Sequence, residues 1–140
     1  MASSDVSFLA RRIDAEAFPL AVVDVLALSA VLTIGVINHN GVEYLSTAPV
    51  AWLLTLVPFL VGWAVASPLI GAYSAGAAES AKAAIPLAIR AWIPAAVIGF
   101  VLRASPLFSG GFQVSFGVVV LLVGGVALIA GRWLFFALLR

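Results

Sequence analysis

The sequence predicts an all-α membrane protein, a polytopic bundle of four transmembrane helices preceded by a short N-terminal amphipathic helix. Of its 140 residues, 64% are hydrophobic and 9% are charged, whereas an ordinary soluble domain has roughly 45–50% and 25%. Four apolar runs, each near the ~20 residues that a bilayer core requires, are separated by short polar turns. So few charges could not cover a soluble protein of this size, and we therefore expect the bilayer as its surroundings.

The elements follow from periodicity and from turn residues. Residues 1–17 mix charged and apolar side chains at spacings near three and four, which predicts a surface helix over about 5–16. Proline suits the first turn of a helix, as at Pro49, and Asn-Gly and Ser-Pro pairs favour turns. We expect residues 1–140 to form a single integral membrane domain with spans at about 18–38, 49–70, 84–103 and 113–133.

The orientation follows from the positive side chains near the span ends, which tend to stay in the cytoplasm. Only Arg103 falls on one side of the predicted bundle. The other side carries Arg11, Arg12, Lys82, Arg132 and Arg140. We therefore expect a multi-pass protein of the cell membrane with the N- and C-termini in the cytoplasm.

Composition also narrows the chemistry. A net charge of +1 provides no basic field for nucleic acid, and the absence of cysteine excludes disulfides and thiolate ligands. His39, with Asn38 and Glu43 nearby, supplies one histidine and one carboxylate, which make a poor metal shell. Because it is the single histidine, a bis-histidine haem within one chain is excluded. No nucleophile–base set is recognisable. We expect no metal, no cofactor and no enzymatic activity.

Asp24 is the first candidate site residue, because an ionised carboxylate inside a span costs roughly 2.5–3.5 kcal/mol. Arg90, in the third span, is expected at a similar depth near the cytoplasmic third, and an ion pair would bury both charges most cheaply. Such a pair can fix helix packing alone. It can also form an ion or proton site in which Asp24 changes its protonation state.

Two further features surround this pair. At 100° per residue, Asn38 falls on the same face of the first span as Asp24, with His39 at the edge of that face. Prolines within the second and third spans free backbone carbonyls. They indicate either plain kinks or the unwound, ion-coordinating backbone that transporters use.

Glycine recurs every seventh residue along the fourth span, which defines one stripe of a helix-packing surface. The third span offers a matching stripe of alanines. These stripes favour packing of spans three and four within one protomer, or a seam between copies in a homo-oligomer. The glycines are Gly110, Gly117, Gly124 and Gly131.

Several ordered segments resemble the small membrane family catalogued as domain of unknown function 3054. They are Gly35-Val36-Ile37-Asn38-His39-Asn40-Gly41, Pro58-Phe59-Leu60-Val61-Gly62-Trp63, Val101-Leu102-Arg103-Ala104-Ser105-Pro106 and the late Arg132, with Asp24 upstream. The resemblance covers all four spans and implies no assigned activity. It implies that Asp24, Asn38, His39, Trp63 and Arg103 occupy recurrent positions of the family.

Two classes of function follow. The first is a small transporter or channel-like protein with an intramembrane Asp/Arg site, in which a permeation path needs a second protomer because four helices enclose little volume. The second is a non-catalytic accessory or scaffold subunit of a larger membrane protein complex. In both, the partners are the lipid bilayer and further membrane-protein chains.

Overall fold

A computed structural model of the chain describes residues 12–108, 111 and 113–139. Within these residues it contains six helical elements. They are η1 (Ala15–Ala17), α2 (Phe18–Asn40), α3 (Tyr44–Thr47), α4 (Pro49–Ile70), α5 (Ala81–Ala104) and α6 (Val114–Leu139).

The all-α prediction is confirmed, and four helices are long and apolar enough to cross a membrane. Three of them end within three residues of the predicted bounds. The last helix, α6, continues to Leu139, beyond its predicted end at 133. The predicted surface helix over about 5–16, with Arg11, lies largely outside the described residues, as do Gly110 and Arg140. The described part of that segment ends in the short 3-10 helix η1.

The ends of the long helices are set by local chemistry. The Ser80 side chain caps α5 by accepting a hydrogen bond from the Ala83 amide at 3.2 Å. Gly41 ends α2 and Gly71 ends α4, each with φ near +90°, a conformation that only glycine adopts without strain. The chain therefore turns sharply after both helices.

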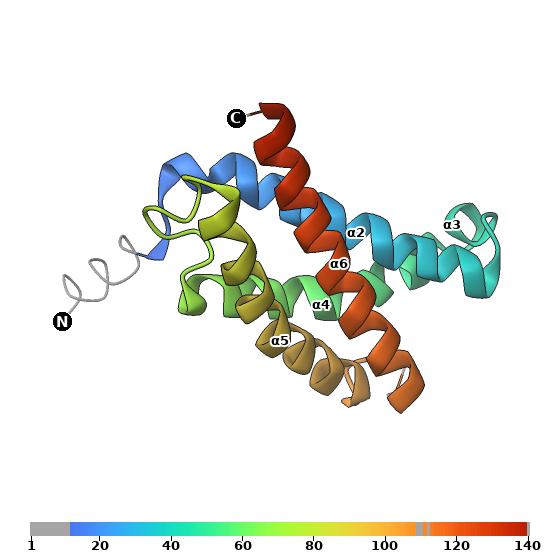
Figure 1. The fold of residues 1–140 in the computed structure, drawn as a ribbon. Coiled ribbons are helices and arrows are strands. Elements are labelled where there is room, and N and C mark those ends of the chain that lie inside the picture. Colours follow the sequence, from blue (N-terminus) through green and yellow to red (C-terminus); the bar gives the residue numbers. More distant parts are fainter. Residues whose placement is uncertain (1–11, 109–110, 112, 140) are drawn as a thin grey trace.

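The four long helices form a closed ring in which each packs against two others. The α4–α5 contact is the most extensive, α5–α6 and α2–α6 follow, and α2–α4 is the least extensive. Figure 1 shows that α2 and α6 cross and then diverge, so that α2 runs on toward α3 while the start of α6 lies near the end of α5. The bundle is consequently tight at the end where α2 begins and splayed at the end where α2 finishes.

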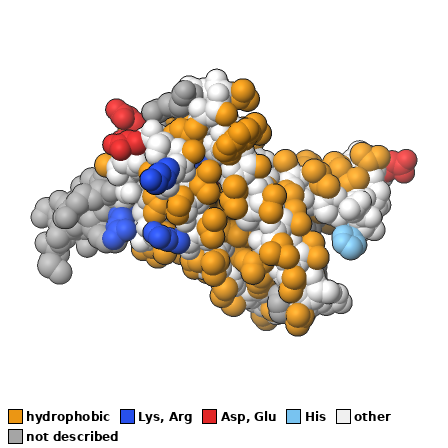
Figure 2. Space-filling view, viewed as in Figure 1, with side chains coloured by type: hydrophobic (Ala, Val, Ile, Leu, Met, Phe, Trp, Pro, Cys, Tyr) orange, Lys and Arg blue, Asp and Glu red, His pale blue; other side chains and the backbone are white. Residues whose placement is uncertain are grey.

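The outer surface is apolar around the middle of the bundle, as lipid requires. Side chains such as Leu26, Leu122 and Val126 are more than 60% exposed there. On the face drawn in Figure 2, the visible Lys and Arg side chains lie toward one end and the histidine lies at the other. The fold is that of a multi-pass membrane protein.

Close backbone contacts explain the small residues inside the bundle. A Cβ built on Gly62 of α4 falls on the backbone carbonyl of Ala95 of α5, and one on Gly99 falls on the ring of Phe59. The small-residue stripe of α5, which was expected to pack against the fourth span, therefore packs against α4 at these positions.

The glycine stripe of α6 divides between two neighbouring helices. Gly124 accommodates the ring of Trp92 on α5, whereas Gly131 lies against Val23 and Ala27 of α2. Gly117 is buried as well. Packing within one protomer thus accounts for Gly124 and Gly131, and a homo-oligomer seam stays a prediction.

The internal prolines do not unwind their helices. α4 continues through Pro58 and Pro68, and α5 continues through Pro86 and Pro94. The alternative of unwound, ion-coordinating backbone is therefore wrong for these two helices.

The Gly62–Ala95 contact leads to a stability prediction. Gly62→Ala should lower the free energy of unfolding by roughly 1–3 kcal/mol, because the added methyl group must push α4 away from the α5 backbone. Reversible unfolding by denaturing detergent would measure the change.

Gly35→Ala is the matched control, since a Cβ there meets nothing within 4 Å. Its stability should be unchanged or slightly higher. Equal losses in the two variants would mean that the α4–α5 contact is looser than described.

Candidate functional site

The most polar point inside the bundle is a bidentate ion pair between Asp24 of α2 and Arg132 of α6. The Arg132 Nε donates to Asp24 Oδ1 at 3.0 Å, and its Nη2 donates to Asp24 Oδ2 at 2.6 Å. Both side chains are 0% exposed. Charge-assisted bonds with this fork geometry are among the strongest that side chains make.

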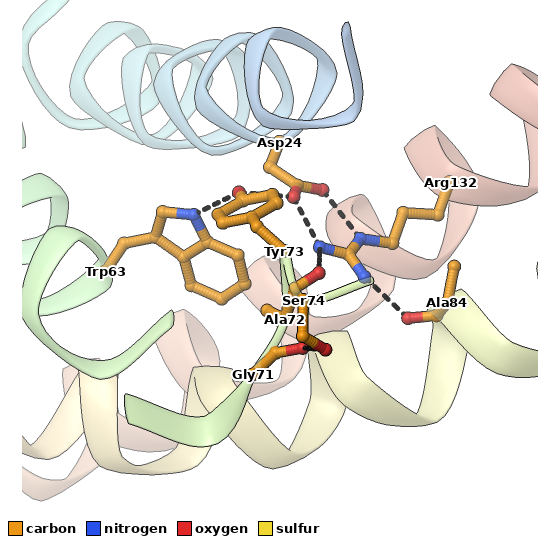
Figure 3. Close-up of polar contacts among 8 residues, drawn as sticks. All are labelled: Asp24, Trp63, Gly71, Ala72, Tyr73, Ser74, Ala84 and Arg132. Carbon is orange, nitrogen blue, oxygen red and sulfur yellow. Dashed lines mark hydrogen bonds and ion pairs between the residues drawn. The ribbon is translucent and has the colours of Figure 1, made fainter. Parts of the chain in front are cut away.

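Arg132 also binds the backbone of two other segments. Its Nη1 donates to the Ala84 carbonyl at 2.6 Å, near the start of α5, and its Nη2 reaches the Ala72 carbonyl at 3.5 Å. Figure 3 shows the guanidinium lying between the carboxylate and these carbonyls. One side chain thereby joins α2, α5, α6 and the segment after α4.

The carboxylate receives a third donor through an aromatic relay. Tyr73 donates its phenolic hydrogen to Asp24 Oδ2 at 2.6 Å, and Trp63 of α4 donates its indole hydrogen to the Tyr73 oxygen at 2.7 Å (Figure 3). The Arg132 guanidinium also lies 5.5 Å from the centre of the Tyr73 ring. With Trp63, the network includes a side chain or carbonyl from every long helix. We call Asp24, Trp63, Tyr73 and Arg132 the ion-pair network.

The turn after α4 delivers Tyr73 into the bundle. Gly71 in the left-handed conformation ends α4, and the Ala72 amide bonds back to the Ser67 carbonyl at 2.9 Å. The Asp14 amide then donates to the Tyr73 carbonyl at 2.7 Å. The chain before η1 and the turn after α4 therefore hold Tyr73 from both sides.

Burial next to a carboxylate fixes the protonation of Tyr73. Desolvation raises the pKa of its phenol far above the ordinary value of 10, and the neighbouring Asp24 carboxylate raises it further. Tyr73 therefore stays protonated and remains a hydrogen-bond donor at any physiological pH.

The predicted partner of Asp24 was wrong. Arg90 is exposed on the outer face of α5, and the carboxylate meets Arg132 instead. The inner face of α5 is its alanine stripe, which includes Ala88 and Ala91. Arg90 lies off that stripe at 100° per residue, so the sequence already contained the signal against it.

Arg132 was a candidate through the family resemblance and Tyr73 was not a candidate, and neither was expected beside Asp24. Arg132 was expected at a membrane interface because span four was taken to end at 133, but α6 continues to Leu139 and carries Arg132 inside. Tyr73 belongs to a loop of small residues, where only its aromatic ring set it apart. Trp63, expected only from the family resemblance, lies 3% exposed within the network.

The remaining candidate residues gather at the splayed end of the bundle. A groove of about 360 Å³ lies there between the C-terminal half of α2 and the N-terminal half of α6, with contributions from α4 and α5. Among its lining residues are Leu32, Asn38, His39, Thr55, Arg103, Phe116, Val120 and Gly124. The structure thus separates Asn38, His39 and Arg103 from Asp24.

The groove stops short of the ion-pair network. Leu28 of α2 and Leu128 of α6 are both 0% exposed. Each lies one turn from its network residue, between that residue and the groove. A layer of two buried leucines therefore separates the groove from the fully buried ion pair.

Fold and site together define a multi-pass membrane protein with a buried ion pair at one end and a groove at the other. The chain matches the family described as protein of unknown function (DUF3054) over residues 21–135, and it belongs to that family. Comparisons with the curated proteins and with the solved structures find no match. The matched region includes Asp24, Arg103 and Arg132.

The ion pair leads to a second prediction. Arg132→Gln should destabilise the protein by roughly 3–5 kcal/mol, because it leaves the Asp24 carboxylate buried without its counter-charge. The free energy of unfolding in detergent would measure this loss.

The double variant Asp24→Asn/Arg132→Gln should recover part of the loss, since it leaves no unpaired charge. Arg90→Gln is the control, and as an exposed position it should change stability by less than roughly 0.5 kcal/mol. A double variant as unstable as the sum of its single variants would show that the two charges do not act as a pair.

Proposed function

We propose that the protein is a small transporter in which the groove admits substrate from one side of the membrane and the ion-pair network is the closed gate on the other. The observation that supports this proposal is the order in which the groove, a leucine layer and the ion pair follow one another along the bundle. A groove open at one end is followed by the Leu28–Leu128 layer and then by the sealed Asp24–Arg132 pair.

This arrangement matches what alternating access requires of one of its two states. A transporter holds its site open to one side while contacts close the other, and the closing contacts must break in the opposite state. An ion pair is suited to that role because it has discrete made and broken arrangements. The α2–α4 contact, the least extensive between neighbouring long helices, borders the groove, and a tilt of α2 there would have to break the hydrogen bond from Trp52 Nε1 to Thr33 Oγ1 at 3.0 Å.

The predicted cytoplasmic location of both termini gives the proposal a direction. The ion-pair network lies at the end where α2 begins and α6 finishes. The gate would then face the cytoplasm, and the groove would open to the outside. Arg90, exposed on α5, has no part in this mechanism.

Cysteine accessibility tests the gate without knowledge of the substrate. The chain has no native cysteine, so Thr55→Cys in the groove and Leu28→Cys beyond it can each be introduced alone. In otherwise unchanged protein, a membrane-impermeant maleimide should label Thr55→Cys from the groove side only. Adding Asp24→Asn/Arg132→Gln should raise labelling of Leu28→Cys from the network side and lower labelling of Thr55→Cys. Each ~1.4 kcal/mol that the closed gate loses shifts this balance about tenfold.

The reciprocal change separates gating from simple loosening, because a loosened bundle would raise labelling at both positions. Arg90→Gln in place of the double variant is the matched control and should alter neither rate. Unchanged labelling in the Asp24→Asn/Arg132→Gln background would remove the gate and with it the transporter proposal.

A second candidate function, a non-catalytic accessory subunit, is favoured by the completeness of the network. Every buried nitrogen and oxygen of the Asp24 and Arg132 side chains has a partner, which leaves no charged atom free for substrate. Such a network suits a rigid scaffold as well as a gate.

Gentle extraction from native membranes tests the subunit role. A scaffold should bring down a larger membrane protein at fixed stoichiometry, and substitution of lipid-facing residues on one helix should release it. Recovery of the chain alone, or only with copies of itself, would count against this role.

A further inference from the structure

One buried polar atom of the half-buried Arg103 side chain, which lines the groove, has no hydrogen-bond partner. Arg103 Nε is buried and has no hydrogen-bond partner, and it is the one such side-chain atom in the described part of the chain. An unpaired buried donor costs roughly 1–3 kcal/mol, and more when the group is charged. A position that keeps such a donor calls for an acceptor from outside the chain.

Stacking holds the Arg103 head in place without using its donors. The guanidinium carbon lies 4.4 Å from the centre of the Phe116 ring, a cation–π contact with the face of the guanidinium that uses none of its N–H donors. Both residues line the groove. The guanidinium is therefore positioned for a ligand that brings its own acceptors.

The lining of the groove is polar at one end and apolar along its length. Arg103, Asn38 and His39 lie near the ends of their helices, where the membrane meets water. Leu32, Val120 and Val123 line the part that runs toward the middle of the bundle. This change from polar to apolar lining matches an amphiphile whose head group lies at the membrane surface and whose hydrocarbon tail points toward the middle of the bundle.

The positive charge of Arg103 indicates that the head group of the ligand is anionic. None of the described residues that line the groove is an aspartate or glutamate, so Arg103 faces no carboxylate among them. Asn38 and His39 add neutral hydrogen-bonding groups beside the guanidinium. The complement of this end is a carboxylate or a phosphate, which Arg binds in fork geometry.

We propose that the groove binds an anionic amphiphile, with its acidic head on Arg103 and one acyl chain along α2 and α6. A volume of about 360 Å³ lies at the small end of ligand sites, which favours a single chain over two. The amphiphile is a free fatty acid or one chain of an acidic phospholipid. This inference deepens the proposed transport function by naming the ligand class of the same groove, and binding is measured without transport.

Native mass spectrometry of the purified chain, released from detergent, tests the site with three probes: oleate, dioleoylphosphatidylglycerol and dioleoylphosphatidylcholine. Unaltered protein should retain oleate or the phosphatidylglycerol, and should retain phosphatidylcholine at least about tenfold less. Arg103→Gln should weaken the anionic adduct by at least about tenfold, the loss expected for a hydrogen bond to a charged group. Preference for oleate or for phosphatidylglycerol identifies the source of the acidic head.

Two further variants test whether a loss of lipid binding is specific to Arg103 and to the groove. Arg90→Gln removes an exposed arginine from the same helix and should leave the anionic adduct unchanged. Val119→Trp should narrow the apolar part of the groove and weaken binding while Arg103 is intact. Equal binding by Arg103→Gln, an equal loss in Arg90→Gln or equal retention of phosphatidylcholine would overturn the site. An Arg103-dependent adduct in a protein without alternating access would retain the site and refute only transport.

Discussion

The Asp24–Arg132 pair is the interaction on which the remaining structure depends. In a bilayer, hydrophobic attraction does little to hold one helix against another, and small residues and polar contacts carry the association. Here one guanidinium binds a carboxylate on α2 and carbonyls near the start of α5 and after α4. Tyr73 and Trp63 extend the same network to α4. The tight end of the bundle follows from this set of bonds, whereas toward the splayed end a single side-chain hydrogen bond, from Trp52 to Thr33, joins α4 and α2 among the described residues.

Much of the fold could be predicted from the sequence, because span length and hydropathy are properties of single segments. Three of the four spans match their predicted bounds closely, and the polar character of Asp24 was evident. The choice of partner was not, because it depends on where α6 ends and which face α5 turns inward. An arginine near a span end can extend to the interface or turn into the bundle, and hydropathy does not distinguish the two.

The two ends of the bundle show how differently a membrane protein can treat an arginine. Arg132 has an acceptor for each of its nitrogens and serves the fold. Arg103 has a ring beneath it and a donor without an acceptor, which stability alone does not explain. The resemblance to the family drew attention to both residues, but only the surroundings of each separate a structural arginine from one available for binding. Sequence motifs of this family therefore combine positions with different purposes.

The chain separation of the ion pair has a consequence for biogenesis. Asp24 and Arg132 lie 108 residues apart, so the carboxylate on α2 leaves the ribosome long before its counter-charge on α6 exists. The first helix must therefore enter the membrane, or wait at the insertion machinery, carrying an unmatched charge that costs roughly 2.5–3.5 kcal/mol. Assembly of the bundle is complete only when the last helix arrives. A chain cut short before α6 would present an orphan acidic helix, a feature by which membrane quality control can recognise an unfinished protein.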